Sequence, residues 1–391
     1  ARPWKLIIGG ILGTDCHDPD SDVPLDALGR SGRRRAAAHA RYIDDSGADV
    51  VLLQEVSGVA TLNEIMLHLG GRYEAAYETA QPSAMAACLF VVFFVILSAL
   101  TFMMFEGVGM LFTGVHELNS RFGSRLLRFS AVYLATIWRW RHSSVTQYFI
   151  GSVAGQLAVL RRCECHACGK LAVAGFTAFD DDFMRMGETA ASRSARTGSP
   201  TREESITPIF LRAFFSVRPR GVLRVHMPLS VGMAGLRAQV IVMNTHFPHC
   251  SENSHVTHGI AEMVMSEAAE ACVIFGGDLN PLPHVPVDVQ LGPLIAHGIR
   301  PTSSLIEGSS STPAQFHTWD LKQPLTRYAV ADTPRDMQLD FLLLRSPLAG
   351  AHVVLQQVRT EVVNRGAFHV PGAPLSDHYA LMTTWDCIPR S

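Results

Sequence analysis

The sequence predicts an α+β fold, in which two β-sheets pack face to face with helices outside, interrupted by a hydrophobic helical insertion. Many short apolar runs are typical of buried strands, and only a few segments show the periodicity of a helix. The insertion follows from residues 79–105, which include no charged side chain and are apolar for most of their length. These patterns describe one large domain with an added hydrophobic element.

The first part of the chain alternates predicted strands with predicted helices. Strands are expected over residues 5–12 and 49–53, and helices over residues 31–47 and 61–69. Gly13 follows the first strand and Gly47 closes the first helix, positions where a glycine commonly ends such an element. This start has the order of a β–α–β unit before the hydrophobic stretch interrupts it.

Strands dominate the second part of the chain. They are expected over residues 156–160, 210–217, 221–227, 238–244, 272–275, 338–344, 352–356 and 379–385. One helix is expected over residues 258–271, directly before the strand that leads into a glycine-rich turn. Residues 161–205 predict a second insertion, whose later part is small and polar and therefore typical of a flexible loop.

Composition favours some classes of function over others. The 391 residues carry a formal net charge of −2, so the chain lacks the overall positive charge typical of nucleic-acid-binding proteins. Hydrophobic residues make up 48% and charged residues only 17%, a balance that favours a membrane-associated or complex-embedded chain. Arg33-Arg34-Arg35 is a local basic run within this weakly charged sequence.

The hydrophobic insertion is assigned to residues 79–150, and it divides a domain formed by residues 1–78 and 151–391. About 20 consecutive apolar residues can cross a bilayer as a helix, although a helix buried in protein also explains them. Because both parts of the divided domain must lie on the same side of a membrane, the insertion has to return. A hairpin with a short second leg, a re-entrant helix or a helix packed on neighbouring subunits would satisfy this requirement.

A cluster of potential metal ligands lies at the start of the second insertion. Its members are Cys163, Cys165, His166 and Cys168. Thiolates and imidazole are preferred ligands of zinc, so the cluster could hold this metal. All four residues crowd into one short segment without a second spaced pair, so free thiols or a local disulfide are the alternative.

Five polar motifs follow or interrupt predicted strands. They are Leu53-Gln54-Glu55-Val56, Asn244-Thr245-His246-Phe247, Gly276-Gly277-Asp278-Leu279-Asn280, Leu339-Asp340-Phe341 and Leu375-Ser376-Asp377-His378. Together they contain a carboxylate suited to a hard metal, two histidines, an Asp/Asn pair and two further aspartates. Metal-assisted phosphodiester hydrolysis uses these residue types, because it needs a base for water and a donor to the phosphoryl or departing oxygens.

The order and context of these motifs resemble the endonuclease/exonuclease/phosphatase superfamily, which includes DNase I and the neutral sphingomyelinases. The resemblance covers residues 4–78 and 151–387, and it implies a four-layer αββα sandwich like that of DNase I. It also implies that Glu55 binds the metal, Mg²⁺ or Mn²⁺, and that Asp377 is a second acidic contact near this metal.

The resemblance assigns roles to the other polar residues of the motifs. His378 would be the general base, and His246 would be a phosphate-binding donor or acid. Asp340 would orient one imidazole through its ring N–H. Asp278 would position water or the histidine, and Asn280 would donate from its amide to a phosphoryl oxygen.

One position departs from the family pattern. The first strand of the family ends in an asparagine that contacts metal and phosphate, and aligning the strand ends puts Gly10 at this position. Glycine has no side chain to coordinate a metal, and Asp15 or Asp18 could substitute. The segment Thr318-Trp319-Asp320 also resembles a recurrent family segment, which we interpret as structural packing.

The motifs and the insertion together favour a Mg²⁺-dependent phosphodiesterase that hydrolyses a membrane phospholipid, similar to a sphingomyelinase and of the phospholipase C type. A catalytically weakened or inactive accessory subunit of a membrane protein complex is the alternative, which Gly10 favours. A nuclease is a further alternative, although it rests on Arg33-Arg34-Arg35 alone. The expected partners are a membrane lipid and other membrane-protein subunits rather than nucleic acid, and the expected location is at a membrane.

Overall fold

The computed structural model describes residues 4–10, 30–54, 56, 58–77, 157–163, 171–179, 221–231, 236–247, 253–303, 312–322, 335–363, 368–370, 373–376 and 378–390, with the isolated residues 92, 95, 96, 99 and 365. The strands are β1 (Trp4–Gly10), β2 (Val50–Gln54), β3 (Tyr73–Tyr77), β4 (Ala158–Arg162), β5 (Ala172–Ala178), β6 (Gly221–Val231), β7 (Leu236–His246), β8 (Cys272–Asp278), β9 (Arg300–Pro301), β10 (Asp340–Arg345), β11 (Val353–Val363), β12 (Phe368–Val370), β13 (Ala373–Pro374) and β14 (Ala380–Pro389). The helices are α1 (Arg30–Ser46), α2 (Gly58–Leu69), α8 (Asn253–Met265), α9 (Val287–Gln290), α10 (Gly292–Ala296) and the 3₁₀ helix η2 (Ala314–Phe316).

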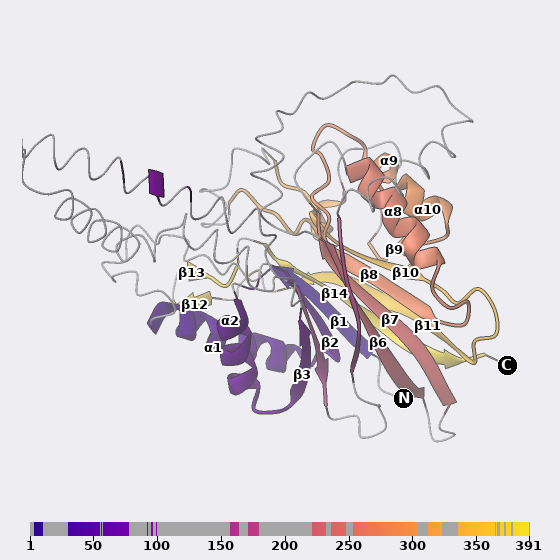
Figure 1. Cartoon of the computed structure of the whole chain (residues 1–391), viewed down its shortest axis with the longest axis horizontal. Coiled ribbons are helices and arrows are strands. Elements are labelled where there is room, and N and C mark those ends of the chain that lie inside the picture. Colours follow the sequence, from indigo (N-terminus) through magenta and orange to yellow (C-terminus); the bar gives the residue numbers. More distant parts are fainter. Residues whose placement is uncertain are drawn as a thin grey trace, which may run out of the picture.

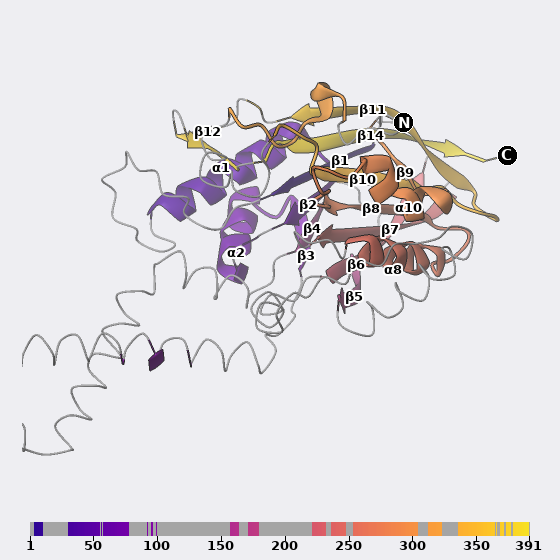
Figure 2. The same cartoon turned by 90° about the horizontal axis from the view of Figure 1, so that it is seen from above.

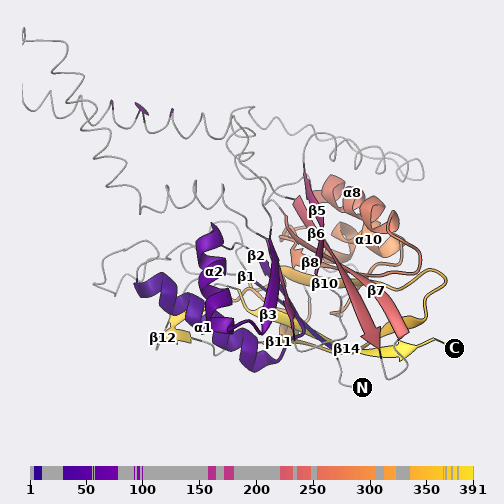
Figure 3. The same ribbon diagram turned by 60° about the horizontal axis from the view of Figure 1, so that its bottom comes forward.

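Two six-stranded sheets form the centre of the molecule. One sheet has the strand order β11-β14-β1-β2-β4-β3, and the other has the order β5-β6-β7-β8-β10-β9. α1 and α2 pack on the outer face of the first sheet, and α8, α9 and α10 pack on that of the second (Figure 1). Seen from above, the strands of both sheets follow one another from β11 and β9 at one edge to β3 and β5 at the other (Figure 2). Helix, sheet, sheet and helix are the layers that the sequence predicts, and Figure 3 shows the helices on opposite sides of the strands.

The alternation of side chains along each strand explains these layers, because successive residues point to opposite faces of a sheet. In β7, Val240 and Val242 belong to the core between the two sheets. Ile241 and Met243 point the other way and pack in the core under α8. β2, β8 and β10 alternate in the same manner, so each sheet is apolar on both faces and needs a cover on both.

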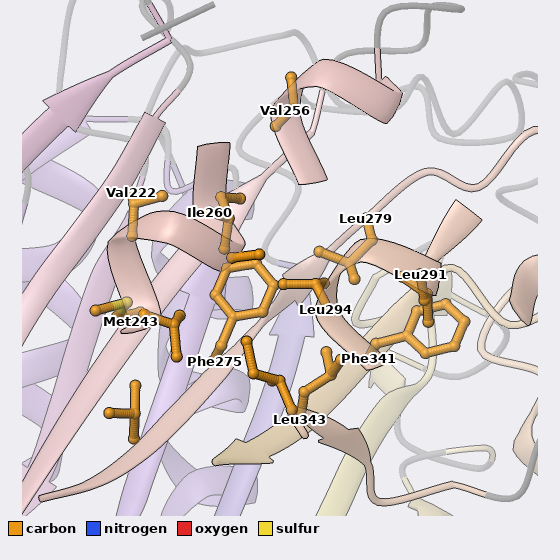
Figure 4. Packing of buried hydrophobic residues seen from close by; sticks show 14 of the residues in the cluster. Val222, Met243, Val256, Ile260, Phe275, Leu279, Leu291, Leu294, Phe341 and Leu343 are labelled. Atoms are coloured by element: carbon orange, nitrogen blue, oxygen red, sulfur yellow. The ribbon is translucent and has the colours of Figure 1, made fainter. Parts of the chain in front are cut away.

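The core under α8 and α10 shows how tightly the outer layer is bound to its sheet. Phe275 of β8 points toward Ile260 of α8 and Leu294 of α10, and Phe341 of β10 lies beside Leu291 (Figure 4). All five side chains are buried. This packing holds β8 and β10 in place, and these strands carry two of the aspartates in the motifs.

Polar side chains link the two sheets where β2 and β7 approach their carboxyl ends. Gln54, the last residue of β2, donates from Nε2 to Oδ1 of Asn244 in β7 over 2.6 Å. The Asn244 amide donates in turn to the main-chain oxygens of Leu53 and Ala158, at 2.9 and 3.0 Å. Asn244 is fully buried, and these bonds hold the two sheets together at this point. Gln54 directly precedes Glu55, and Asn244 precedes His246 by two residues.

A buried arginine determines where α8 ends. Arg345, the last residue of β10, is 1% exposed, and burial lowers the pKa of its guanidinium. The guanidinium donates hydrogen bonds of 2.7–3.2 Å to four main-chain oxygens, those of Val264, Glu267, Ala268 and Ala271. These bonds stabilise the chain after Met265, where α8 ends before the end of the predicted range of 258–271; α8 also begins earlier than predicted, at Asn253.

We expect Arg345→Met to lower the free energy of unfolding by about 2–4 kcal/mol, because several buried main-chain oxygens would lose their donor. Urea denaturation followed by circular dichroism measures this loss. Arg300→Met is the matched control, because Arg300 is exposed and its replacement should cost less than about 0.5 kcal/mol. Equal losses in the two variants would contradict the assigned role of Arg345.

The predicted insertion over residues 79–150 lies outside the described residues except at Val92, Val95, Ile96 and Ala99. These four residues are helical, and the first three are 43–54% exposed. Within the described part of the chain, no helix has both the length and the apolar character needed to span a bilayer. The transmembrane helix expected from the sequence is therefore not among the described elements.

The predicted second insertion over residues 161–205 contains a strand of the sandwich. β5 pairs with β6 in antiparallel orientation, and β4 extends to Arg162. This part of the range therefore belongs to the sheets, and the later part, which the sequence predicts to be a flexible loop, lies outside the described residues. The strand expected over residues 210–217 lies outside the described residues.

Candidate active site

Three of the predicted site residues meet at one end of the second sheet. His246 ends β7, Asp278 ends the neighbouring parallel strand β8, and the two residues are paired in the register. Asp340 begins the antiparallel strand β10 and is paired with Asp278 on its other side. The alternation of each strand places all three on the face that turns toward the first sheet, in line with Val242, Ile274 and Leu342 of the core.

His378 joins this group through a hydrogen bond to Asp340. The His378 Nδ1 lies 2.8 Å from Oδ2 of Asp340, whose side chain is fully buried. Because a carboxylate accepts, the ring donates from Nδ1–H and keeps a lone pair on Nε2. The bond therefore holds His378 in the tautomer that a general base requires, and Asp340 lies where the sequence predicts an orienting carboxylate.

Three residues outside the predicted set hold the His378–Asp340 pair in position. The Thr318 Oγ1 accepts from the main-chain N–H of Asp340 over 3.1 Å. Trp319 meets the His378 ring edge-on, with 5.2 Å between the ring centroids. The Ser376 Oγ accepts from the main-chain N–H of His378 over 3.2 Å. The Thr318-Trp319 segment thus packs on His378.

His246 and Asp278 form a second histidine–carboxylate pair. The His246 Nε2 lies 3.4 Å from Oδ2 of Asp278, and both side chains are about nine-tenths buried. The main-chain N–H of Phe247 donates to the Asp278 main-chain oxygen over 2.8 Å and continues the ladder by one residue. The contact places the His246 ring beside the Asp278 carboxylate at the end of β7 and β8.

Asn280 closes the turn after β8 in a left-handed conformation with a φ of 42°. Its main-chain N–H donates to Asp278 Oδ1 over 3.0 Å, an arrangement that asparagine and aspartate favour in turns. Its side-chain amide donates to the main-chain oxygen of Phe247 over 3.0 Å. Asn280 therefore ties the end of β8 to the end of β7, and its predicted bond to a phosphoryl oxygen remains a prediction.

Gly277 is required where β7 and β8 approach each other just before the site. Its φ is +148°, and a Cβ at this position would lie 1.8 Å from the main-chain oxygen of Thr245. Only glycine fits such an approach. Gly277 thus allows the close packing of the two strands that carry His246 and Asp278.

The structure places Gly10 at the same end of the molecule. It ends β1 and pairs with Gln54 in the parallel register, so a side chain at position 10 would share the inward face with Gln54. β1 also contacts β8 and β10, the strands of Asp278 and Asp340, across the sandwich. Position 10 therefore lies at the end of the sandwich that carries His246, Asp278 and Asp340, and its role as a metal-ligand position stays a prediction. Asp15 and Asp18, its possible substitutes, lie outside the described residues.

The two predicted metal ligands, Glu55 and Asp377, also lie outside the described residues. They are next in sequence to Gln54 and His378, whose side chains are held by hydrogen bonds. Within the described part of the chain, no three His, Cys, Asp or Glu side chains are grouped to hold a metal. Two carboxylates together with water are nevertheless the ligands that Mg²⁺ prefers, so this donor set fits a hard divalent cation.

The cysteine cluster is described at one position only. Cys163 is an exposed free thiol at the end of β4, and Cys165, His166 and Cys168 lie outside the described residues. Zinc binding by this cluster stays a prediction. Two other thiols are internal, and burial raises the pKa of Cys272 and that of Cys387, the latter to about 11.

Comparison of the sequence with models of protein families gives no match, and comparison with curated protein sequences gives none either. Solved structures do match. TDP2 from D. rerio, complexed with a single-strand DNA product, has a TM-score of 0.49 at 13% identity, covering 99% of this chain and 100% of that chain. The endonuclease/exonuclease/phosphatase from Bacteroides vulgatus has the same TM-score, identity and coverage. The human Nocturnin catalytic domain with bound sulfate has a TM-score of 0.46 at 12% identity, covering 99% and 95%.

One of these neighbours carries the name of the endonuclease/exonuclease/phosphatase superfamily that the five motifs resemble. Identities of 12–13% and TM-scores below 0.5 carry no information on the substrate. The function proposed below therefore rests on the side chains of the site.

Proposed function

We propose that this chain is a divalent-metal-dependent phosphodiesterase. The observation that carries the proposal is the presence of two histidine–carboxylate pairs, His378–Asp340 and His246–Asp278, at one end of the sandwich. A hydrolase of this kind needs one group that accepts a proton from water and one that donates to oxygen. In the proposal the first pair supplies the base, and the second pair supplies the donor.

In the proposed reaction, His378 Nε2 takes a proton from the attacking water, and the buried Asp340 carboxylate stabilises the imidazolium that forms. His246 donates to the phosphoryl oxygens or to the departing oxygen while Asp278 holds its ring. The water oxygen bonds to phosphorus, and the bond from phosphorus to the departing oxygen breaks. Asn280 keeps the two strand ends together and carries an amide that can donate to a phosphoryl oxygen.

The proposed cofactor is Mg²⁺ or Mn²⁺, held by Glu55 and Asp377. When bound, such an ion offsets the negative charge that develops on the phosphoryl oxygens. Removal of divalent cations with a chelator is part of the test described below.

The proposed substrate is a membrane phospholipid, cleaved as by a sphingomyelinase so that a phosphorylated headgroup is released. The long uncharged stretch over residues 79–105 supports it, as do the exposed apolar side chains of Val92, Val95 and Ile96. Apolar residues exposed outside the core favour contact with a lipid surface or with another membrane protein. Association with a membrane is therefore part of the proposal.

The proposal is tested with the purified full chain, Mg²⁺ and vesicles of sphingomyelin or phosphatidylcholine. Release of a water-soluble phosphorylated headgroup, abolished by EDTA and restored by Mg²⁺, is the expected result. Single-stranded and double-stranded DNA are assayed in parallel, and cleavage of DNA alone would instead support the nuclease alternative. Absence of turnover on every phosphodiester would overturn the enzymatic proposal.

Gly10 favours a second candidate function, that of an accessory subunit in a membrane complex whose site has lost activity. Gly10→Asn adds an amide oxygen to the inward face beside Gln54. We expect this variant to bind Mn²⁺ about 10- to 100-fold more tightly than the wild type, the range for partners of a metal site. Isothermal titration calorimetry measures the affinity, and phosphodiester assays measure the turnover.

Gly71→Asn is the matched control for Gly10→Asn. Gly71 lies in a turn with a φ of +76°, which asparagine tolerates, and a Cβ there meets no atom within 4 Å. Activity that appears only with Asn at position 10 would favour the accessory subunit. A wild type that is already active, and that Asn leaves unchanged, would mean that another ligand serves in place of this side chain.

A further inference from the structure

Arg365 lies at the same end of the molecule as the candidate site, although no motif includes it. Val363, the last residue of β11, pairs with Ala380, the first residue of β14. His378 precedes Ala380 by two residues, and Arg365 follows Val363 by two residues. The register of these two strands therefore brings Arg365 and His378 to the same edge of the first sheet.

The contacts of Arg365 join it to the segment that braces the general base. Its guanidinium carbon lies over the Tyr379 ring, 5.5 Å from the ring centre. Tyr379 follows His378 directly, and its main-chain N–H donates to the Thr318 oxygen over 2.7 Å. One Arg365 nitrogen, Nη2, also lies 3.4–3.5 Å from main-chain oxygens, those of Ala314, Gln315 and His317. Ring and carbonyls thus hold an exposed cation beside the site.

The charge of Arg365 has no acidic partner among the residues that the structure describes. Arg359, which precedes Arg365 by six residues, is by contrast ion-paired with Glu361. A guanidinium carries a positive charge, and the N–H groups of Nη1 and Nε are not used by the contacts above. Arg365 therefore offers a permanent positive charge and a planar set of donors, which match the oxygens of a phosphate.

We propose that Arg365 is a substrate-binding residue that contacts a phosphate oxygen of the phosphodiester. This inference rests on the proposed function and names a residue that recognises the phosphate anion. The contact is made before and during the reaction alike, so it lowers KM and leaves kcat nearly unchanged. Stacking on Tyr379 restricts the side chain in advance and reduces the entropy lost on binding.

The experiment compares wild type, Arg365→Ala and Arg365→Lys with bis(4-nitrophenyl) phosphate and Mg²⁺. We expect the alanine variant to raise KM about 5- to 20-fold with kcat within about twofold, and the lysine variant to recover part of the loss. Arg359→Ala is the control, because Arg359 is exposed and ion-paired away from the site. Thermal unfolding of each variant shows that the fold is kept.

Binding of inorganic phosphate, measured by calorimetry without turnover, gives an independent readout, and its Kd should rise in Arg365→Ala but not in Arg359→Ala. In a second arm, sphingomyelin vesicles replace the small substrate and KM is measured again. Comparison with the phosphate Kd then shows whether Arg365 binds a lipid headgroup or free phosphate. If the wild type is active and Arg365→Ala leaves both KM and the phosphate Kd unchanged, the inference about Arg365 is overturned and the proposed function stands. A wild type that hydrolyses nothing would overturn the proposed function, while the phosphate Kd would still decide the role of Arg365.

Discussion

Replacing His378 with alanine is expected to lower kcat for phosphodiester hydrolysis by about 10²- to 10⁴-fold, the usual contribution of a positioned acid or base. The imidazole is the group that accepts a proton from water, and its Nδ1 is held by the buried Asp340 carboxylate at 2.8 Å. Asp340→Asn is expected to fall in the same direction, because an amide that donates to Nδ1 favours the other tautomer and removes the lone pair from Nε2.

Steady-state kinetics of these variants are compared with His297→Ala. His297 is exposed after α10 and takes no part in the site, so its replacement should leave kcat unchanged. Thermal unfolding confirms that each variant is folded. If His378→Ala keeps more than a tenth of the wild-type kcat, His378 is not the general base, and another residue would have to accept the proton.

The largest loss of stability is expected from Gly277→Ala. A methyl group at this position would lie 1.8 Å from the Thr245 main-chain oxygen, inside the pairing of β7 with β8. Separation of the two strands is the only relief, since the obstacle is backbone rather than a mobile side chain. We expect the free energy of unfolding to fall by about 4 kcal/mol or more, at the upper end for single substitutions.

Urea denaturation measures the effect of Gly277→Ala against Gly298→Ala. Gly298 has a φ of +75°, but a Cβ there meets no atom within 4 Å, so its variant reports the conformational cost without a clash. That cost is about 1–2 kcal/mol. Equal losses in the two variants would contradict the close approach of β7 and β8. Any Gly277→Ala protein that folds should also lose activity, because His246 and Asp278 end these two strands.

The strands that carry the site could be predicted because their sequences are apolar and end in polar motifs. β7, β8 and β10 all occur where the pattern predicts a strand, although their bounds differ by a few residues. β3 was not predicted, since the alternation of Tyr73-Glu74-Ala75-Ala76-Tyr77 is weak and β4, its partner, lies about 80 residues later. β5 was missed for a related reason, because Ala172–Ala178 is rich in small residues and is recognisable as a strand only through its pairing with β6.

Residues that support the site were also beyond prediction. Thr318 and Ser376 act through single hydrogen bonds to main-chain N–H groups, a role that many threonines and serines could fill. Trp319 gave a signal, because Thr318-Trp319-Asp320 resembles a recurrent family segment, but its contact with His378 depends on a bridge between distant segments. Arg345 gave none, since its four acceptors are main-chain oxygens that no motif marks.

By itself the sequence determined the kinds of layer, the residue types of the site and the absence of a side chain at position 10. These follow from local periodicity and from the chemistry of individual residues, which need no knowledge of distant contacts. Only the tertiary structure decided which histidine pairs with which aspartate. His246 meets Asp278, and His378 meets Asp340, because strand register and the Thr318-Trp319 bridge join segments far apart in the chain. Such pairings depend on the packing of two sheets, which a linear pattern does not contain.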